Sequence, residues 1–217
     1  MGPLDRLVKS GPPATVAGAH EALNSEQSAG QLLEQGMELE QQGQLDEALQ
    51  CYESAIALMP ELARAHFNRG SILLDRGDAL DALDAFTKAV QYKPDSAGAH
   101  FNLGAAYVRL DRHEAAMDAY QQAISLKPDF AQAQMALGAI LEELGQKEAA
   151  VASYRRALEL KPDYTDAHLK LVDVLRQLDR LDEVAECYGR MLALDHDNVA
   201  LLNNLGATRK EQGRHCP

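Results

Sequence analysis

The chain has 217 residues, of which 46% are hydrophobic and 25% are charged, a composition that is typical of a folded polypeptide and excludes a disordered one. The net charge of −12 disfavours nucleic acid and anionic lipid as partners, because an acidic surface repels phosphate groups. No stretch reaches the roughly 20 apolar residues of a membrane span, and the first residues lack the apolar run of a secretory signal. The three cysteines have no C-x-x-C spacing. We therefore expect a cytoplasmic protein with reduced thiols and no membrane partner.

The N-terminal segment, residues 1–28, precedes any regular pattern and is predicted to be a linker. Its stretch SGPPATVAG, residues 10–18, is rich in residues that favour turns. The following AHEALNSEQ is suited to a short helix that covers the first unit of a repeat stack, since the end of a stack needs a cap. We expect this segment to be partly disordered, with order beginning near residue 18.

From residue 29 a 34-residue pattern repeats without an insertion. The phrase YKPDSAGAHFNLG at residues 92–104 returns as LKPDFAQAQMALG at 126–138 and as LKPDYTDAHLKLV at 160–172. With the proline at place 32 of the frame, the predicted units are 29–62, 63–96, 97–130, 131–164 and 165–198, followed by a partial unit at 199–217. A fixed period of this length predicts a stack of similar supersecondary units.

Small residues recur at places 8, 20 and 27 of the frame, an aromatic residue at place 24 and proline at place 32. In order of place, the units hold Gly36, Gly70, Gly104, Gly138 and Gly206; Ala48, Ala82, Ala116 and Ala150; Tyr52, Phe86, Tyr120, Tyr154 and Tyr188; Ala55, Ala89, Ala123 and Ala157; and Pro60, Pro94, Pro128 and Pro162. Apolar places 7, 10, 11 and 14 fall on one face of a helix. A Gly or Asp near place 15 predicts a turn, and proline stops the second helix after about place 30. Each unit is therefore predicted to be two antiparallel helices.

The template also predicts how the helices fit together. Glycine at place 8 costs about 1 kcal/mol of helix propensity, so we expect a close approach there, with the alanine at place 20 facing it. The aromatic residue at place 24 is predicted to belong to the core. Asp95, Asp129 and Asp163 follow their prolines and are predicted to cap the next helix. The fifth unit departs from the template in having larger side chains, namely Val172, Val184, Met191 and His196.

These recurring residues resemble the tetratricopeptide repeat family over residues 29 to about 213. The resemblance implies an all-α fold, a right-handed superhelical solenoid of 34-residue antiparallel helix pairs. It also implies a concave groove lined by places 2, 5, 6, 9, 12 and 13 of each first helix.

Catalysis by these residues is not expected, because the chain has no phosphate-binding glycine loop, metalloprotease motif or nucleophile elbow. His66, His100 and His168 share place 4, but one repeat separates neighbours by roughly 18–20 Å, so they cannot meet at one metal. We interpret them as structural residues. No cofactor and no metal are predicted.

The predicted groove carries asparagines at place 6, and an Asn amide can pair with a peptide's backbone N–H and C=O whatever its side chains. The phrases AHFNLG and LLNNLG resemble the repeats that precede the catalytic region of protein O-linked N-acetylglucosamine transferases, where an asparagine ladder holds substrate polypeptides. This resemblance carries over to Asn68, Asn102 and Asn204, and is interrupted at Ala136 and Lys170. The alternative is that these amides only solvate a helix face. The residues predicted to set side-chain preference are Phe67, Phe101, Arg64, Arg109, Lys170, Asp173 and Arg176.

The sequence therefore predicts a protein-interaction scaffold that binds an extended peptide or a partner helix. It is not expected to clamp chaperone C-termini, since Asn68 alone matches that family pattern. Two alternatives stay open: the substrate-recognition arm of a larger O-glycosyltransferase, and a self-assembling subunit that forms homo-oligomers through its stack ends. The sixth unit has its predicted turn at Gly213 and then stops, which favours a piece of a longer protein. The first unit has seven acidic residues and no Lys or Arg; we interpret it as a solvated acidic edge at one end of the stack, and a site for a basic partner is the alternative.

Overall fold

Eleven α-helices make up the part of the chain that the structure, a computed structural model, describes: the backbone of residues 16–215 and the side chains of residues 25–213. No strand occurs within that range. The helices are α1 (Val16–Gln41), α2 (Leu45–Leu58), α3 (Ala63–Arg76), α4 (Ala79–Tyr92), α5 (Ala97–Arg109), α6 (His113–Leu126), α7 (Ala131–Glu143), α8 (Lys147–Leu160), α9 (Thr165–Gln177), α10 (Leu181–Leu194) and α11 (Val199–His215).

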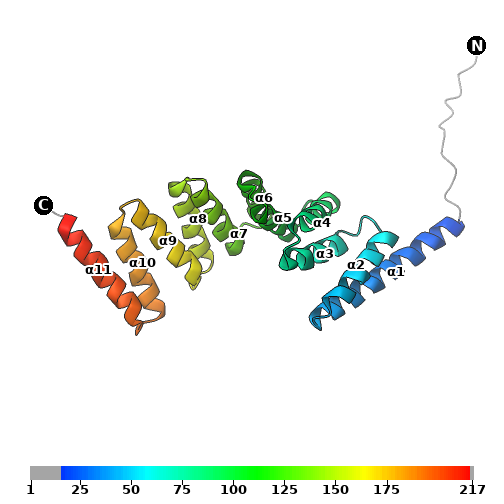
Figure 1. The fold of residues 1–217 in the computed structure, drawn as a ribbon, viewed down its shortest axis with the longest axis horizontal. Coiled ribbons are helices and arrows are strands. Elements are labelled where there is room, and N and C mark those ends of the chain that lie inside the picture. The colour runs from blue at the N-terminus through cyan, green and yellow to red at the C-terminus, as the bar shows by residue number, and fades with distance from the viewer. Residues whose placement is uncertain (1–15, 216–217) are drawn as a thin grey trace, which may run out of the picture.

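Consecutive helices pack in pairs, and the pairs follow one another along a curved stack that begins with α1 and ends with α11 (Figure 1). The helices α3, α5, α7, α9 and α11 begin at place 1 of their units, and α4, α6, α8 and α10 end at place 30, as predicted. The pattern thus predicted the helix boundaries because the proline at place 32 stops each second helix at the same point.

The turn inside each pair lies at place 15, where the backbone is left-handed. Gly43, Gly77 and Gly145 have φ angles of 77°, 91° and 74° there, while Asp111 and Asp179 adopt 58° and 56°. Glycine suits this conformation because it has no Cβ to clash with the backbone. The predicted turn is confirmed, and in two units it is made by a residue that adopts it at a cost.

The glycine at place 8 makes room for the aromatic ring of its own unit. A Cβ on Gly104 would lie 2.6 Å from a ring carbon of Tyr120, and one on Gly138 would lie 2.6 Å from a ring carbon of Tyr154. Our prediction that the alanine at place 20 faces this glycine was wrong: the ring at place 24 does. The alanines at places 20 and 27 are nonetheless buried, as expected of a tight helix–helix seam.

The core runs along the stack in three clusters of buried residues, one at each end and a small one in the middle. The middle cluster is made by Leu73, Ala82, Phe86 and Ala106. The fifth unit belongs to the large C-terminal cluster, and its larger residues Val172, Val184 and Met191 are all buried.

The N-caps of the first helices lie at place 34, one residue later than predicted. Asp95, Asp129 and Asp163 are therefore not caps; the caps are Ser96, Phe130 and Tyr164. Of these three, the Ser96 hydroxyl alone caps its helix, by accepting a hydrogen bond from the N–H of Ala99 at 3.3 Å. The difference matters below, because a phenylalanine or tyrosine at a cap position is free to pack elsewhere.

The two ends differ from expectation in their helices. Helix α1 is continuous from Val16 into the first unit, while residues 1–15 of the predicted linker lie outside the described residues. At the other end α11 continues through Gly213 to His215, so the turn predicted there was wrong. A Cβ added to Gly213 would meet no atom within 4 Å, so the position of this glycine is open. No helix in residues 16–215 is long and apolar enough to cross a membrane.

Candidate functional site

The first helices of the pairs form one side of the stack. Helix α3 contacts α1 and α5 besides its own partner α4, and α7 contacts α9 in the same way. Places 6 and 9 of neighbouring helices meet on this side: the Asn102 amide of α5 donates a long hydrogen bond of 3.4 Å to the Ser71 hydroxyl of α3. This side is the surface on which the predicted site residues lie, and we call it the first-helix surface.

The structure brings two of the three predicted asparagines onto adjacent helices. Asn68 in α3 and Asn102 in α5 are both half-buried. An Asn amide has two donor hydrogens and two acceptor lone pairs, so each side chain retains capacity for a further partner. Asn204 lies on α11 and is exposed, with α7 and α9 between it and Asn102. The predicted asparagines therefore form a neighbouring pair on α3 and α5, and the third lies apart on α11.

The two aromatic residues at place 5 have different surroundings. Phe101 is enclosed by its own chain, with ring centroids 5.5 Å from Tyr120 and 5.0 Å from Phe130. Phe67 packs on Phe86 at 5.9 Å but has no aromatic residue at place 34, where Ser96 stands. Phe67 is thus the one of the two with an open side.

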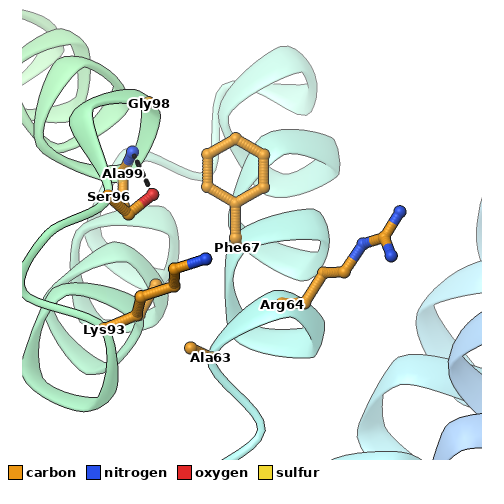
Figure 2. Close-up of a pocket in the computed structure, with 8 residues that line it drawn as sticks. Ala63, Arg64, Phe67, Lys93, Ser96, Gly98 and Ala99 are labelled. Atoms are coloured by element: carbon orange, nitrogen blue, oxygen red, sulfur yellow. Dashed lines mark hydrogen bonds between the residues drawn. The ribbon is translucent and has the colours of Figure 1, made fainter. Parts of the chain in front are cut away.

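A cavity of about 250 Å³ occupies that open side, between the second and third units. Figure 2 shows the Phe67 ring facing the helix start at Ser96 and Gly98, with the Lys93 side chain reaching toward Phe67. Ala63, Ala89 and Ala99 complete the lining, and Arg64 lies at the opposite side from Lys93 with its guanidinium directed away (Figure 2). The cavity therefore has an apolar floor and a cationic rim.

The predicted charged residues fall into two groups. Arg64, Arg109, Lys170 and Asp173 are exposed, and within residues 25–213 none of them forms an ion pair. Arg176 instead binds its own chain: it lies 2.9 Å from the Glu211 carboxylate and donates to the Thr208 hydroxyl at 2.8 Å. It ties α9 to α11.

Tyrosine hydroxyls at place 24 also reach this surface, which the sequence reading missed. Tyr52 donates to the Glu40 carboxylate at 2.6 Å, and Tyr154 donates to Glu142 at 3.0 Å. Burial and the acceptor carboxylate raise the pKa of both tyrosines above its ordinary value. Both glutamates stand at place 12, whereas Phe86, which has no hydroxyl, accompanies a leucine there. The pairing is not part of the repeat pattern, because Tyr120 and Tyr188 accompany Val108 and Arg176 at place 12.

The histidines at place 4 bind the loop that precedes their helix. The Nε2 atoms of His66, His100 and His168 lie 2.8, 2.9 and 2.9 Å from the carbonyl oxygens of Pro60, Pro94 and Pro162. A carbonyl only accepts, so Nε2 carries the proton in each. Burial lowers the pKa of His66, which keeps its ring neutral. The structural interpretation of these residues is confirmed, and no group of three potential metal ligands occurs among the described residues.

The face of α1 at the other end of this surface is acidic and rich in amides. A shallow depression there is lined by Gln27, Gly30, Gln31, Glu34, Gln35 and Glu38. The first-helix surface thus changes from negative at α1 to positive around Phe67.

Comparison with known proteins places these repeats in a family. Models described as "Tetratricopeptide repeat" match residues 33–97, 73–140 and 131–164, which together make up more than half of the chain. Among curated proteins none matches this chain.

Solved structures with the same arrangement of helices include MamA, with 24% identity and a TM-score of 0.73 over 80% of this chain and 94% of that one. YrrB, described as a TPR protein with an unusual peptide-binding site, has 20% identity and a TM-score of 0.70 over 88% of this chain and 97% of that one. The first TPR of Spaghetti (RPAP3), bound to the HSP90 peptide SRMEEVD, has 26% identity and a TM-score of 0.53 over 54% of this chain and 93% of that one. The predicted all-α solenoid of helix pairs is confirmed.

Proposed function

Because this chain belongs to the tetratricopeptide repeat family, we propose that it is a protein-interaction scaffold whose first-helix surface binds an extended segment of a partner protein. The observation that carries the proposal is the position of Asn68 and Asn102: two half-buried amides at the same place of neighbouring helices, each with hydrogen-bonding capacity to spare. Such a pair holds a peptide backbone, because the backbone offers the same groups at every residue.

Two solved structures with the same fold support a peptide as the ligand. The RPAP3 repeat binds a peptide, and the description of YrrB includes a peptide-binding site. The present chain would bind a different chemistry from a chaperone tail, since the clamp positions of its first unit are Leu33 and Met37 and Leu33 is buried. The charge of the surface instead favours a peptide with a basic part beside Glu34 and Glu38 and an acidic part near Arg64.

The experiment is a peptide-display selection on the full chain, followed by affinity measurement for the selected peptides. The variant Asn68→Ala/Asn102→Ala should weaken binding by about tenfold or more, since each lost hydrogen bond contributes about 1 kcal/mol. The matched control is Gln121→Ala/Gln122→Ala, which removes two exposed amides from the second helix α6. Equal affinity of the two double variants would refute the role of the asparagines.

A substrate arm of an O-glycosyltransferase would use the same amides, so it is a narrower form of this proposal. Its specific expectation is that the selected peptides are acceptors of such an enzyme. Glycosylation assays with a catalytic domain encoded in the same gene would test it.

Self-assembly through the stack ends is the second candidate. Val199 and Leu202 of α11 are 67% and 50% exposed, and a Cβ added to Gly206 would meet no atom within 4 Å. However, Arg209 takes place 11, where Leu73, Leu141 and Leu175 of other units are buried, so the exposed face is interrupted by charge. Light scattering as a function of protein concentration tests this candidate: a constant monomer mass would refute it.

A further inference from the structure

The cavity beside Phe67 lies where the third and fourth units have an aromatic side chain and the second unit has none. At place 34 the third and fourth units carry Phe130 and Tyr164, and Tyr164 packs, partly buried, against the large C-terminal core cluster. Phe130 lies against the place-5 residue of its unit, Phe101, at a centroid distance of 5.0 Å. The second unit has Ser96 at place 34, whose hydroxyl caps α5 and adds no apolar surface beside Phe67.

The lysine at place 31 follows the same pattern. The ammonium nitrogen of Lys127 lies 5.0 Å from the centroid of Phe130, and that of Lys161 lies 5.0 Å from the centroid of Tyr164. Both contacts are cation–π interactions. Lys93 is the equivalent residue of the second unit, and its amino group reaches toward the cavity where its aromatic partner is missing (Figure 2).

A second polar cap shows that the gap and the residue at place 34 go together. Asn198 holds place 34 of the fifth unit, accepts a hydrogen bond from the N–H of Leu201 at 3.1 Å, and also lines a cavity of about 330 Å³. There place 31 is Asp195, so that cavity has no ammonium at its rim. Of these two cavities, only the one at Phe67 combines an apolar floor with a lysine at place 31, the residue that contacts an aromatic ring in the third and fourth units.

We propose that the cavity formed by Phe67, Ser96, Gly98 and Lys93 is a recognition pocket for one aromatic side chain of the bound peptide, flanked by an acidic residue. The ring takes the position that Phe130 and Tyr164 take in their units, against Phe67 and under the Lys93 ammonium. The acidic neighbour pairs with Arg64, which is exposed and has no carboxylate partner in residues 25–213. Gly98 leaves the entrance open, since a Cβ there would approach only Phe67, at 3.9 Å.

The pocket rests on the proposed function, because it selects side chains of a peptide that the asparagines hold. It adds the chemical class of the ligand: an aromatic residue next to an acid. A tryptophan peptide makes a clean probe, since the protein has no tryptophan of its own and the emission reports on the peptide alone. The probes are Ac-Gly-Asp-Trp-Asp-Gly-NH2, the same peptide with Leu in place of Trp, and the same peptide with Lys in place of both Asp.

The matched variants are Ser96→Phe and Ser96→Ala. Both remove the cap hydrogen bond, and the second leaves the cavity open while the first fills it with the side chain that the third unit carries there. Circular dichroism should show equal helix content, because Phe130 occupies the same cap position without a side-chain bond. The Trp–Asp peptide should bind wild type and Ser96→Ala alike, and Ser96→Phe at least tenfold more weakly.

The affinity of the Leu peptide is measured by its ability to displace the Trp–Asp peptide. It should be about fivefold weaker than that of the Trp–Asp peptide, because the Leu peptide lacks the ring contacts. The Lys peptide, which keeps the tryptophan, should bind several-fold more weakly than the Trp–Asp peptide. The proposal is overturned if the Trp–Asp peptide does not bind at about 1 mM protein, or if Ser96→Phe binds it as tightly as wild type does. It is also overturned if the Leu peptide and the Lys peptide bind as tightly as the Trp–Asp peptide. If selected peptides lose affinity for Asn68→Ala/Asn102→Ala but not for Ser96→Phe, peptide binding by the first-helix surface is supported and the aromatic pocket at Phe67 is refuted.

Discussion

The glycine at place 8 gives the sharpest test of how the units pack, because the same template position has opposite surroundings in two units. In Gly104→Ala the new Cβ would lie 2.6 and 2.8 Å from two ring carbons of Tyr120. That ring is 4% exposed and is held between its neighbours, so it has little room to move away. In Gly206→Ala the new Cβ meets nothing within 4 Å.

Two opposing contributions set the size of the effect. Overpacking of a core costs roughly 1–3 kcal/mol, and replacing a helical glycine by alanine returns about 1 kcal/mol. We therefore expect Gly104→Ala to lower the free energy of unfolding by up to about 2 kcal/mol and Gly206→Ala to raise it by about 0.5–1 kcal/mol.

Urea unfolding followed by circular dichroism measures both changes. Hydrogen exchange at α5 and α6 should accompany it, because a stack of repeats can unfold unit by unit. If Gly104→Ala stabilises the chain as Gly206→Ala does, the contact between the glycine and the ring does not limit the packing, and the reasoning is refuted.

Three further predictions concern other recurring places. Asp179→Gly should raise the free energy of unfolding by about 1 kcal/mol, since Asp179 has a φ of 56° in a turn where other units have glycine; a loss of stability in urea unfolding would contradict this. Tyr52→Phe should lower it by about 1–2 kcal/mol, because it removes a hydrogen bond to the Glu40 carboxylate, and an unchanged unfolding midpoint would refute that contribution. The lowered pKa of His66 means that the unfolded chain takes up a proton below about pH 6.5 while the folded chain stays neutral. Stability should therefore fall as the pH falls below 6.5, and His66→Gln should reduce this slope in unfolding curves measured across that range.

The helix boundaries could be predicted from the sequence because local signals determine them. Proline at place 32 and the left-handed residue at place 15 act within their own turns, so five in-register copies give the same answer each time. The partner of the glycine at place 8 could not be predicted in this way. A small residue indicates that something approaches closely, but an alanine at place 20 and a ring at place 24 satisfy that pattern equally well. Only the rotation of one helix against the other, set by the whole seam, decides between them.

The candidate site was predicted in kind but not in detail. The first-helix surface and the positions of Asn68 and Asn102 follow from the period of the repeat. That Arg176 binds α11 does not, because its partners lie one repeat away: Glu211 at place 13, which has no recurring residue, and Thr208 at place 10, where the pattern predicts an apolar residue. The cavity at Phe67 could not be predicted for a related reason: place 34 has no recurring residue in the sequence, and its role becomes visible only where Phe130 packs against Phe101.

Repeats make this kind of inference stronger than it would be in an ordinary domain, because neighbouring units act as internal references. The same backbone is built five times, so a cavity beside Phe67 that Phe130 and Tyr164 fill in later units is a difference in one side chain and not in the fold. Filling that space would cost a single substitution at residue 96, and the third unit shows that a phenylalanine is tolerated at this cap. An additional aromatic contact contributes roughly 0.5–1.5 kcal/mol, but the change also removes the Ser96 cap hydrogen bond, which contributes about as much, so stability alone does not decide between serine and phenylalanine at this position. The serine leaves Phe67 open on the helix that also carries Asn68, and the neighbouring helix carries Asn102. This coincidence is what a surface that binds through one inserted side chain requires.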